Sequence, residues 1–241
     1  MTDAVAQSGL MLEVAVAKLS KYAVRESGDT VEVTERPHGG LSVVLADGQG
    51  SGRNAKTMSN LVAKKAINLL ADGTRDGAAA RAVHDFLFAY RHGQVSAELA
   101  IVSADLVTRS VVISRNTHCP ALVTRDGVLE LWADPCNAIG LYPNTKPAIT
   151  QIPIALGALA VIYSDGIHDA GVRKLKRLDA VAAVEPLLAA GAQAIADGLL
   201  AAALAADDGR AGDDMSVAVM AARPADRSDG ARRLKMELPL A

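Results

Sequence analysis

The sequence predicts a layered α+β domain with antiparallel β-sheets inside and helices outside. Strand-like and helix-like segments fall into separate blocks along the chain instead of alternating, which favours antiparallel sheets over a parallel one. The chain has 241 residues and is 50% hydrophobic, enough to bury the core of one large domain or two small ones. No internal repeat or linker divides the sequence. We therefore expect one domain over residues 1–222.

The first block contains three strands joined by turns. Residues 11–19 are rich in Val and Leu, and residues 30–36 alternate between apolar and polar side chains. A polar turn at residues 25–29 separates these two strands, and residues 37–40 predict a hairpin turn. Residues 41–46 are a short apolar run with β-branched side chains, which is typical of a buried strand.

Two amphipathic helices are predicted next. Residues 54–70 and 78–90 each place apolar side chains at helical spacing along one face. The inward-facing residues of the two helices are Met58, Leu61, Val62, Ala66, Leu69, Leu70, Val83, Phe86, Leu87 and Tyr90. Both helices therefore have one face that must pack on a sheet.

The rest of the domain repeats this order, with strands before helices. The candidate strands are residues 98–107, 110–115, 121–125, 128–132, 148–153 and 158–163, and Asp126-Gly127 marks a hairpin turn. The Ala-rich residues 180–190 and 192–206 predict helices, and residues 215–221 predict a closing strand. We expect the charged residues 223–241 to form a flexible tail.

Composition excludes several classes of protein. The net charge is −2, so nucleic acid and anionic membranes are not the expected partners. Cys119 and Cys136 lack CxxC spacing, which argues against a disulfide framework and suits a reducing compartment. The N-terminal residues lack the pattern of a signal peptide, and the longest apolar run, residues 152–163, is too short to span a bilayer. We therefore expect a cytoplasmic location.

Four acidic positions share one local pattern. The chain has eight Asp-Gly pairs, most of which must be ordinary turns. Asp29 directly precedes a strand, Asp47 ends the apolar run 41–46, Asp165 follows the apolar strand that ends near Tyr163, and Asp213 precedes the strand 215–221. Each could be a plain turn residue. Strand ends that are far apart in sequence can also meet at one edge of stacked sheets.

If they meet, the four carboxylates predict a site for hard cations. All-oxygen ligand sets suit Mg²⁺ or Mn²⁺. Two such ions can activate a water molecule and stabilise displacement at phosphorus. The glycine-rich run after Asp47 lacks the Lys of a P-loop, so nucleotide binding is not expected.

These motifs resemble those of the metal-dependent protein phosphatases (PPM, type 2C), and most closely the bacterial SpoIIE-like branch. The ordered matches are Gly28-Asp29, residues 46–52 (ADGQGSG), residues 163–170 (YSDGIHDA) and residues 212–216 (GDDMS). Residues 116–123 (NTHCPALV) and 138–140 (AIG) resemble further signatures of that branch. The likeness extends over about residues 10–221.

The resemblance implies a fold, a metal site and an activity. The family fold is a four-layer αββα sandwich, with two central antiparallel β-sheets flanked by helix pairs. By resemblance, Asp47 bridges two Mn²⁺ or Mg²⁺ ions, and the Gly48 carbonyl helps to bind one of them. Asp165 and Asp213 hold the first ion, and Asp29 lies on the side of the second, directly or through water. The implied reaction is attack of a metal-activated water on phosphoserine or phosphothreonine. The implied substrate is a phosphorylated regulatory protein in bacterial stress or sigma-factor signalling, such as an anti-sigma-factor antagonist.

Several positions near these motifs have two interpretations. His168 is a candidate proton donor, because imidazole titrates near neutral pH, but it is also consistent with a packed or solvated side chain. Asp169 could shape the site or form a turn, and we interpret Asp214 as a supporting residue or strand cap. Thr117 stands where the family usually has Gly, and Gln49 where eukaryotic members have His. The phosphate-binding Arg of those members has no clear counterpart, although Arg25 lies near.

Three hypotheses remain open from the sequence. The leading one is an active serine/threonine phosphatase. The second is a phosphatase-fold module that binds a phosphoprotein without turnover. The third is a different metal hydrolase that acts on nucleotides or diesters. The helices predicted at 54–70 and 78–90 could act as a switch, as their counterparts do in the SpoIIE-like branch, or simply cover the sheet.

Overall fold

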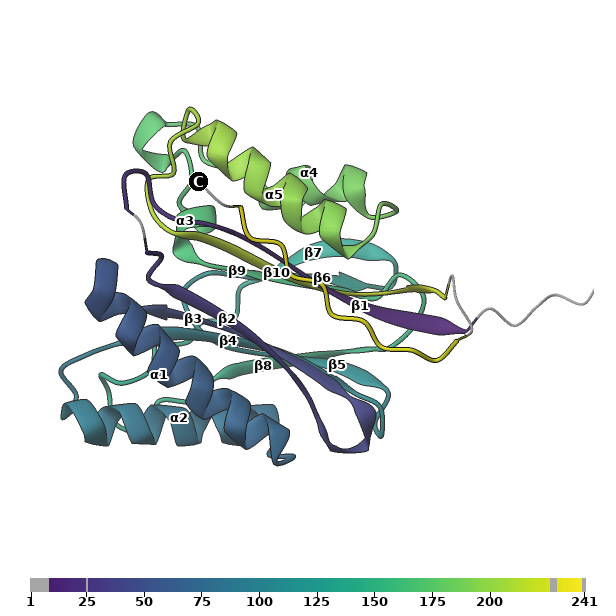
Figure 1. The fold of residues 1–241 in the computed structure, drawn as a ribbon, viewed down its shortest axis with the longest axis horizontal. Helices are drawn as coiled ribbons and strands as arrows, with labels where there is room; N and C mark the ends of the chain where they lie inside the picture. Colours follow the sequence, from purple (N-terminus) through teal and green to yellow (C-terminus); the bar gives the residue numbers. More distant parts are fainter. Residues whose placement is uncertain (1–8, 25, 226–228, 240–241) are drawn as a thin grey trace, which may run out of the picture.

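Two five-stranded antiparallel sheets lie face to face at the centre of the molecule (Figure 1). The structure is a computed structural model that describes residues 9–24, 26–225 and 229–239. The first sheet has the order β1 (Leu10–Leu19), β10 (Met215–Pro224), β9 (Leu159–Tyr163), β6 (Ala121–Arg125), β7 (Val128–Trp132). The second has the order β2 (Asp29–Glu35), β3 (Leu41–Gly48), β4 (Ala97–Asp105), β5 (Ser110–Asn116), β8 (Ala148–Pro153). We call them the β1 sheet and the β2 sheet.

Helix pairs cover the two outer faces. Helices α1 (Gly52–Ala71) and α2 (Asp76–Arg91) pack on the β2 sheet, and α4 (Ala180–Val184) and α5 (Ala192–Ala206) pack on the β1 sheet (Figure 1). The short helix α3 (Asp165–His168) follows β9, and the 3-10 turns are Pro37–Gly39, Val172–Lys174 and Glu185–Leu187. The predicted α+β class and four-layer αββα sandwich are confirmed.

The continuous apolar runs of the central strands follow from burial on both faces. On β3, Val43 faces the other sheet and packs in the inter-sheet core, whereas its neighbour Val44 packs against the residues of α1 and α2. On β10, Ala218 faces the inter-sheet core and Val219 packs against α5. Successive strand residues point to opposite faces, so strands that are buried on both faces are mainly apolar along their length.

Two differences from the boundaries predicted by the sequence have a clear physical cause. The helix expected over residues 180–190 breaks into α4 and a 3-10 turn, because Pro186 has no N–H to continue the helical hydrogen bonds. Strand β10 extends to Pro224, since its last residues pair with Leu10 and Met11 of β1. Arg25 lies outside the described residues.

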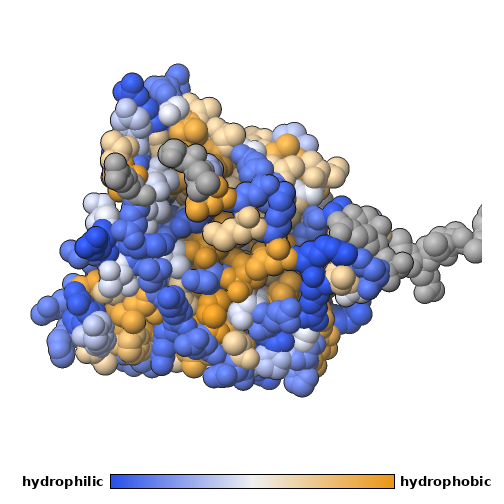
Figure 2. Space-filling view, in the orientation of Figure 1, coloured by the Kyte–Doolittle hydropathy of each residue, from blue (hydrophilic) through white to orange (hydrophobic). Residues whose placement is uncertain are grey.

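The described part of the C-terminal tail runs back across the open side of the sandwich (Figure 1). Residues 229–239 contain no helix or strand. Arg232 contacts the Oε2 of Glu35 at 2.7 Å and the carbonyl oxygen of Gly39. Leu234, Met236 and Leu238 are exposed, and apolar side chains gather over the middle of this face (Figure 2). Among the described residues, no helix has the length and apolar character needed to cross a membrane.

Candidate metal-dependent active site

A row of three carboxylates crosses the end of the β2 sheet. In the antiparallel register, Asp29 on β2 lies opposite Asp47 on β3, and Asp47 lies opposite Glu98 on β4. Residues directly opposite each other on neighbouring strands place their side chains on the same face. The register of three strands therefore brings together acids that are 18 and 51 positions apart in the sequence (29 to 47, 47 to 98).

The β1 sheet contributes a second group of acids at the same end of the sandwich. Asp165 begins α3 directly after β9, and Asp213 and Asp214 directly precede β10. Strands β9 and β10 are paired, and a hydrogen bond of 3.0 Å from the Ser164 N–H to the Ser216 carbonyl continues the pairing to this end. The loop after one strand and the loop before its neighbour are therefore adjacent.

The two groups line one cavity of about 210 Å³. All five predicted metal-site residues, Asp29, Asp47, Gly48, Asp165 and Asp213, line it, together with Gln49, Gly50, Ser96, Ala97, Glu98 and Asp214. His168 is not among the lining residues. The structure thus brings together every predicted ligand and leaves the predicted proton donor outside.

The cavity concentrates negative charge, which the ion pair between Lys21 and Asp213 at 3.6 Å and the contact of His118 with Glu98 only partly offset. Burial, and then the charges of Asp29, Asp165, Glu98 and Asp213, raise the pKa of Asp47 to about 10. Burial raises the pKa of Asp29 to about 6, partly offset by the nearby hydroxyls of Ser216 and Ser164. Burial and the charge of Asp213 raise the pKa of Asp165 to about 6. Carboxylates in such a setting favour either protons or bound cations.

Asp29 shows the fit to a cation most directly. Its side chain is buried, and within the described chain neither carboxylate oxygen has a hydrogen-bond partner. A buried carboxylate without a partner is costly unless a cation is present. The donor set of the cavity consists of oxygen atoms, which suits Mg²⁺ or Mn²⁺.

The carboxylate oxygens of the cavity aspartates lie farther apart than the ligand atoms of a single compact metal site. Within the described residues, three possible ligand atoms come within 4.8 Å of one another in Glu98–His118–Cys119 and in His118–His168–Asp169. The aspartates do not form such a group. This spacing is compatible with Mg²⁺, which usually keeps several waters and binds only one or two carboxylates directly.

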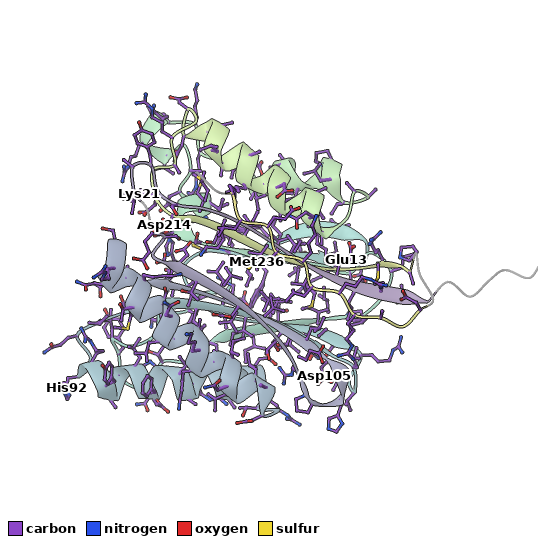
Figure 3. The ribbon with its side chains drawn as sticks, viewed as in Figure 1. Glu13, Lys21, His92, Asp105, Asp214 and Met236 are labelled. Carbon is purple, nitrogen blue, oxygen red and sulfur yellow. The ribbon has the colours of Figure 1, made fainter. Side chains whose placement is uncertain are left out.

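Asp214 holds the loop that carries Asp29. Its Oδ1 accepts a 2.9 Å hydrogen bond from the Lys21 N–H, and its Oδ2 accepts a 2.7 Å bond from the Gly28 N–H. Figure 3 shows Lys21 and Asp214 at the same end of the sandwich. Both carboxylate oxygens are therefore used to fix backbone, which agrees with our interpretation of Asp214 as a supporting residue.

Two lysines that the sequence analysis missed lie behind Asp29. The ammonium groups of Lys18 on β1 and Lys56 on α1 donate to the Asp29 carbonyl oxygen at 2.9 and 2.6 Å. Burial, and then the charge of Lys56, lower the pKa of Lys18. The pair places positive charge beside the acidic cavity and links a sheet strand and a helix to the predicted ligand. Their positions in the sequence carry no motif.

Glu98 is the main functional candidate that the sequence did not indicate. Thr117 donates its hydroxyl to Oε2 of Glu98, and the Nδ1 of His118 lies against Oε1, both at 2.5 Å. Burial pushes the pKa of Glu98 up, but the hydrogen bonds from His118 and Thr117 outweigh it and lower the pKa. Thr117, which departs from the family Gly, therefore has a specific role in this chain. The strand prediction placed Glu98 only at the start of 98–107.

The loop that carries these residues is fixed by a buried arginine. Arg115 donates to the carbonyl oxygens of Thr117 at 3.1 Å, of Cys119, and of Asp134 at 2.8 Å. Its guanidinium also lies over the ring of Trp132, 4.5 Å from the centroid. The geometry of the 117–119 loop thus depends on one side chain from β5.

His168 is held outside the cavity by its neighbours. Arg177 donates to its Nε2 at 2.7 Å, and the imidazole ring of His118 meets its ring edge to face, with centroids 5.4 Å apart. Burial, and then the charge of Arg177, lower the pKa of His168, so its neutral form is favoured. A neutral ring that accepts a hydrogen bond at Nε2 is poorly suited to donate a proton there. The geometry does not support the proton-donor interpretation of His168.

Gln49 is also constrained. Its side-chain carbonyl accepts a hydrogen bond from the backbone N–H of Ser96 at 3.0 Å. The backbone N–H of Gln49 donates to the backbone carbonyl of Ser96 at 3.3 Å. Gln49 therefore ties the glycine-rich turn before α1 to the start of β4, on the rim of the cavity.

Comparison with solved structures shows that the fold is the one found in PP2C-type protein phosphatases. The PP2C phosphatase domain of SpoIIE from Bacillus subtilis, solved with a fragment of its regulatory domain, matches with a TM-score of 0.75 at 21% identity, over 90% of this chain and 65% of that one. The S. agalactiae serine/threonine phosphatase matches with a TM-score of 0.65 at 15% identity, over 88% of this chain and 99% of that one. RsbX in complex with magnesium matches with a TM-score of 0.66 at 14% identity, over 87% and 94%.

The family is shown by sequence. The profile of the stage II sporulation protein E (SpoIIE) family matches residues 37–223, more than half of the 241-residue chain. Among curated proteins, none matches the sequence. The chain belongs to the SpoIIE family.

Proposed function

We propose that this chain removes phosphate from serine or threonine of a regulatory phosphoprotein, in a cavity that holds two divalent cations, Mn²⁺ or Mg²⁺. The observation that carries the proposal is the convergence of Asp29, Asp47, Asp165 and Asp213 on one cavity, with the Asp29 carboxylate buried and unpaired. Structural carboxylates seldom gather in this way without a counter-charge.

The residues that would hold the cations are those of the cavity. Asp47 is central, because four other acids raise its pKa, and it would bridge the two ions. Asp165 and Asp213 would hold one ion, Asp29 would lie on the side of the other, directly or through water, and the Gly48 carbonyl would help to bind one of the two. Bound divalent cations supply Lewis-acid chemistry at such a site, lowering the pKa of a water molecule and stabilising charge at phosphorus.

The chain's own residues orient the site. Asp214 fixes the loop before Asp29, and Lys18 and Lys56 hold the Asp29 carbonyl. The hydrogen bonds between Gln49 and Ser96 fix the rim beside Gly48. No histidine or lysine lines the cavity among the described residues, so we place no general acid there.

The substrate is proposed from the family. RsbX and the RsbU and RsbW domains of Rv1364c from Mycobacterium tuberculosis are among the proteins that share the fold. We propose that this chain acts in the same kind of signalling, on a phosphorylated regulatory protein such as an anti-sigma-factor antagonist. A cytoplasmic location remains a prediction.

The decisive test is turnover of a phosphoserine peptide with Mn²⁺ or Mg²⁺ present or chelated. We expect turnover with either ion and none with chelator. Asp47→Asn should lower kcat at least about a hundredfold, because it removes the central ligand. Asp126→Asn, a change of the same chemistry in the β6–β7 hairpin, should leave turnover unchanged. Full turnover by Asp47→Asn would exclude the proposed site, and phosphopeptide binding without turnover would favour the binding-module hypothesis.

A further inference from the structure

A second cluster of metal-ligating side chains lies beside the acidic cavity. His118, His168 and Asp169 bring three possible ligand atoms within 4.8 Å of one another. His168 ends α3 and Asp169 follows it, whereas His118 comes from the loop after β5. None of the three lines the acidic cavity, and the proposed phosphatase chemistry uses none of them. The cluster is therefore a separate feature of this end of the molecule.

His118 is already oriented in the way of a metal ligand. Its Nδ1 contacts Oε1 of Glu98 at 2.5 Å, and because an ionised carboxylate only accepts, Nδ1 carries the hydrogen. Histidines that bind metals usually donate their second ring N–H to a carboxylate in this manner. The other nitrogen, Nε2, has only a 4.0 Å contact with the Cys119 sulfur. It is thus available to a cation.

Arg177 occupies the position that a cation would take. Its guanidinium lies 2.7 Å from Nε2 of His168 and 4.0 Å from Oδ1 of Asp169, which are two members of the cluster. The Arg177 side chain is 58% exposed, so it can move into solvent without losing a buried environment. The cluster therefore already binds one positive charge, and that charge is displaceable.

We propose that His118, His168 and Asp169 form a site for a borderline divalent transition-metal ion, of which Zn²⁺ is the best fit, and that Arg177 leaves when the ion binds. Two imidazoles and one carboxylate, with a water in the fourth position, are a known ligand set for Zn²⁺. The oxygen-lined cavity beside it suits Mg²⁺ or Mn²⁺ instead. The inference goes beyond the proposed phosphatase function and does not depend on it.

The test follows the imidazole nitrogens directly. Zn²⁺ is titrated into the full chain in excess Mg²⁺, and long-range proton–nitrogen NMR correlations report on the chain's five histidines. We expect the ring nitrogens of His118 and His168 to shift with the first equivalent of Zn²⁺, while those of His38, His84 and His92 stay in place. Unmoved His118 and His168 signals would overturn the proposal, whatever the phosphatase activity.

Four variants separate a built site from two independent histidines. His168→Gln and Asp169→Asn should weaken Zn²⁺ binding at least about tenfold, as loss of a ligand does, whereas His92→Gln at the end of α2 should not. Arg177→Ala should strengthen binding, because no guanidinium then competes with the ion. If Arg177→Ala leaves the affinity unchanged or lowers it, the displaceable-cation proposal is wrong. The unchanged backbone amide spectrum of each variant checks its fold.

Discussion

At the scale of single residues, Asp47 and Asp29 show how one cavity couples stability to charge. Their carboxylates are ionised at neutral pH in an unfolded chain, where the ordinary pKa is 3.8. In the fold, burial raises the pKa of Asp29 to about 6, and burial with neighbouring acids raises that of Asp47 to about 10. Without a cation, the folded chain therefore holds protons that the unfolded chain releases.

This difference predicts a pH dependence of stability in the absence of divalent cations. Groups whose pKa is raised by folding stabilise the fold below their unfolded pKa and lose that contribution as pH rises through the folded value. As the pH rises from about 4 to 6, Asp29 and Asp165 should each lower the free energy of unfolding by up to about 3 kcal/mol, and Asp47 should extend the decline toward pH 10. Urea denaturation in chelator at several pH values measures it.

Two variants test this pH dependence: Asp29→Asn, and Asp126→Asn as its control. Asp29→Asn removes a titrating group and should flatten the slope, whereas Asp126→Asn in the exposed hairpin should not change it. A free energy of unfolding that rises across pH 4 to 6 would contradict the assignment of buried, uncompensated acids.

Gly48 shows a steric constraint at the same site. A Cβ added there would lie 2.1 Å from the Ala55 carbonyl oxygen in the first turns of α1. Gly48→Ala must therefore push β3 and α1 apart and should cost about 2 kcal/mol or more, with loss of turnover. Gly157→Ala, in a turn with open space around it, should cost only about 1 kcal/mol through its positive φ. Thermal denaturation and turnover of both variants check this.

At the scale of elements, Asp214, which directly precedes β10, contacts the loop between β1 and β2. This contact fixes the position of Asp29. Asp214 accepts from the backbone of Lys21 and Gly28 in that loop. An amide in place of its carboxylate would direct an NH₂ group at one of these N–H donors. The loop would then lose a charge-assisted hydrogen bond and gain a repulsive contact.

We accordingly expect Asp214→Asn to destabilise the fold by about 1–3 kcal/mol and to weaken Mn²⁺ binding without abolishing it. Asp214 would act by positioning, so saturating Mn²⁺ should restore most of kcat, whereas it should not rescue Asp47→Asn. Calorimetric titration of Mn²⁺ alongside kcat at saturation distinguishes the two behaviours. Equal, unrescued losses in both variants would make Asp214 a direct ligand.

The elements themselves were largely predictable from sequence. Apolar runs of four to eight residues with turn residues around them identified β3 and β9, and helical spacing identified α1 and α2, because these signals are local. The errors in the predicted boundaries arose where a single residue or a pairing between distant strands overrides the local pattern. Pro186 ends α4 inside an Ala-rich segment, and pairing with β1 carries β10 to Pro224.

At the scale of the whole molecule, the acidic end of the sandwich should make folding depend on divalent cations. A cation that binds only the folded chain stabilises it by RT ln(1 + [L]/Kd), or about 2.7 kcal/mol at a hundred times Kd. For a chain of this size, that corresponds to a rise in Tm of roughly 5–10 °C.

We expect this rise with Mn²⁺ at pH 8, and a much smaller one at pH 5, where protons compete for Asp29 and Asp165. Differential scanning calorimetry at both pH values measures it, with K⁺ at matched ionic strength as the control for screening. An equal rise at both pH values, or with K⁺, would argue against binding at these carboxylates.

The sequence by itself predicted the αββα class, which the structure confirms, and five site residues, which the structure brings to one cavity, because both predictions rest on local patterns and on ordered motifs around Asp47. Only the tertiary structure decided which other residues join them. The β3–β4 register brings Glu98 opposite Asp47, sheet-to-helix packing brings Lys18 and Lys56 to one carbonyl, and the stacking of two sheets brings His118 beside His168. Such contacts depend on register and on the packing of distant segments, which no local pattern encodes.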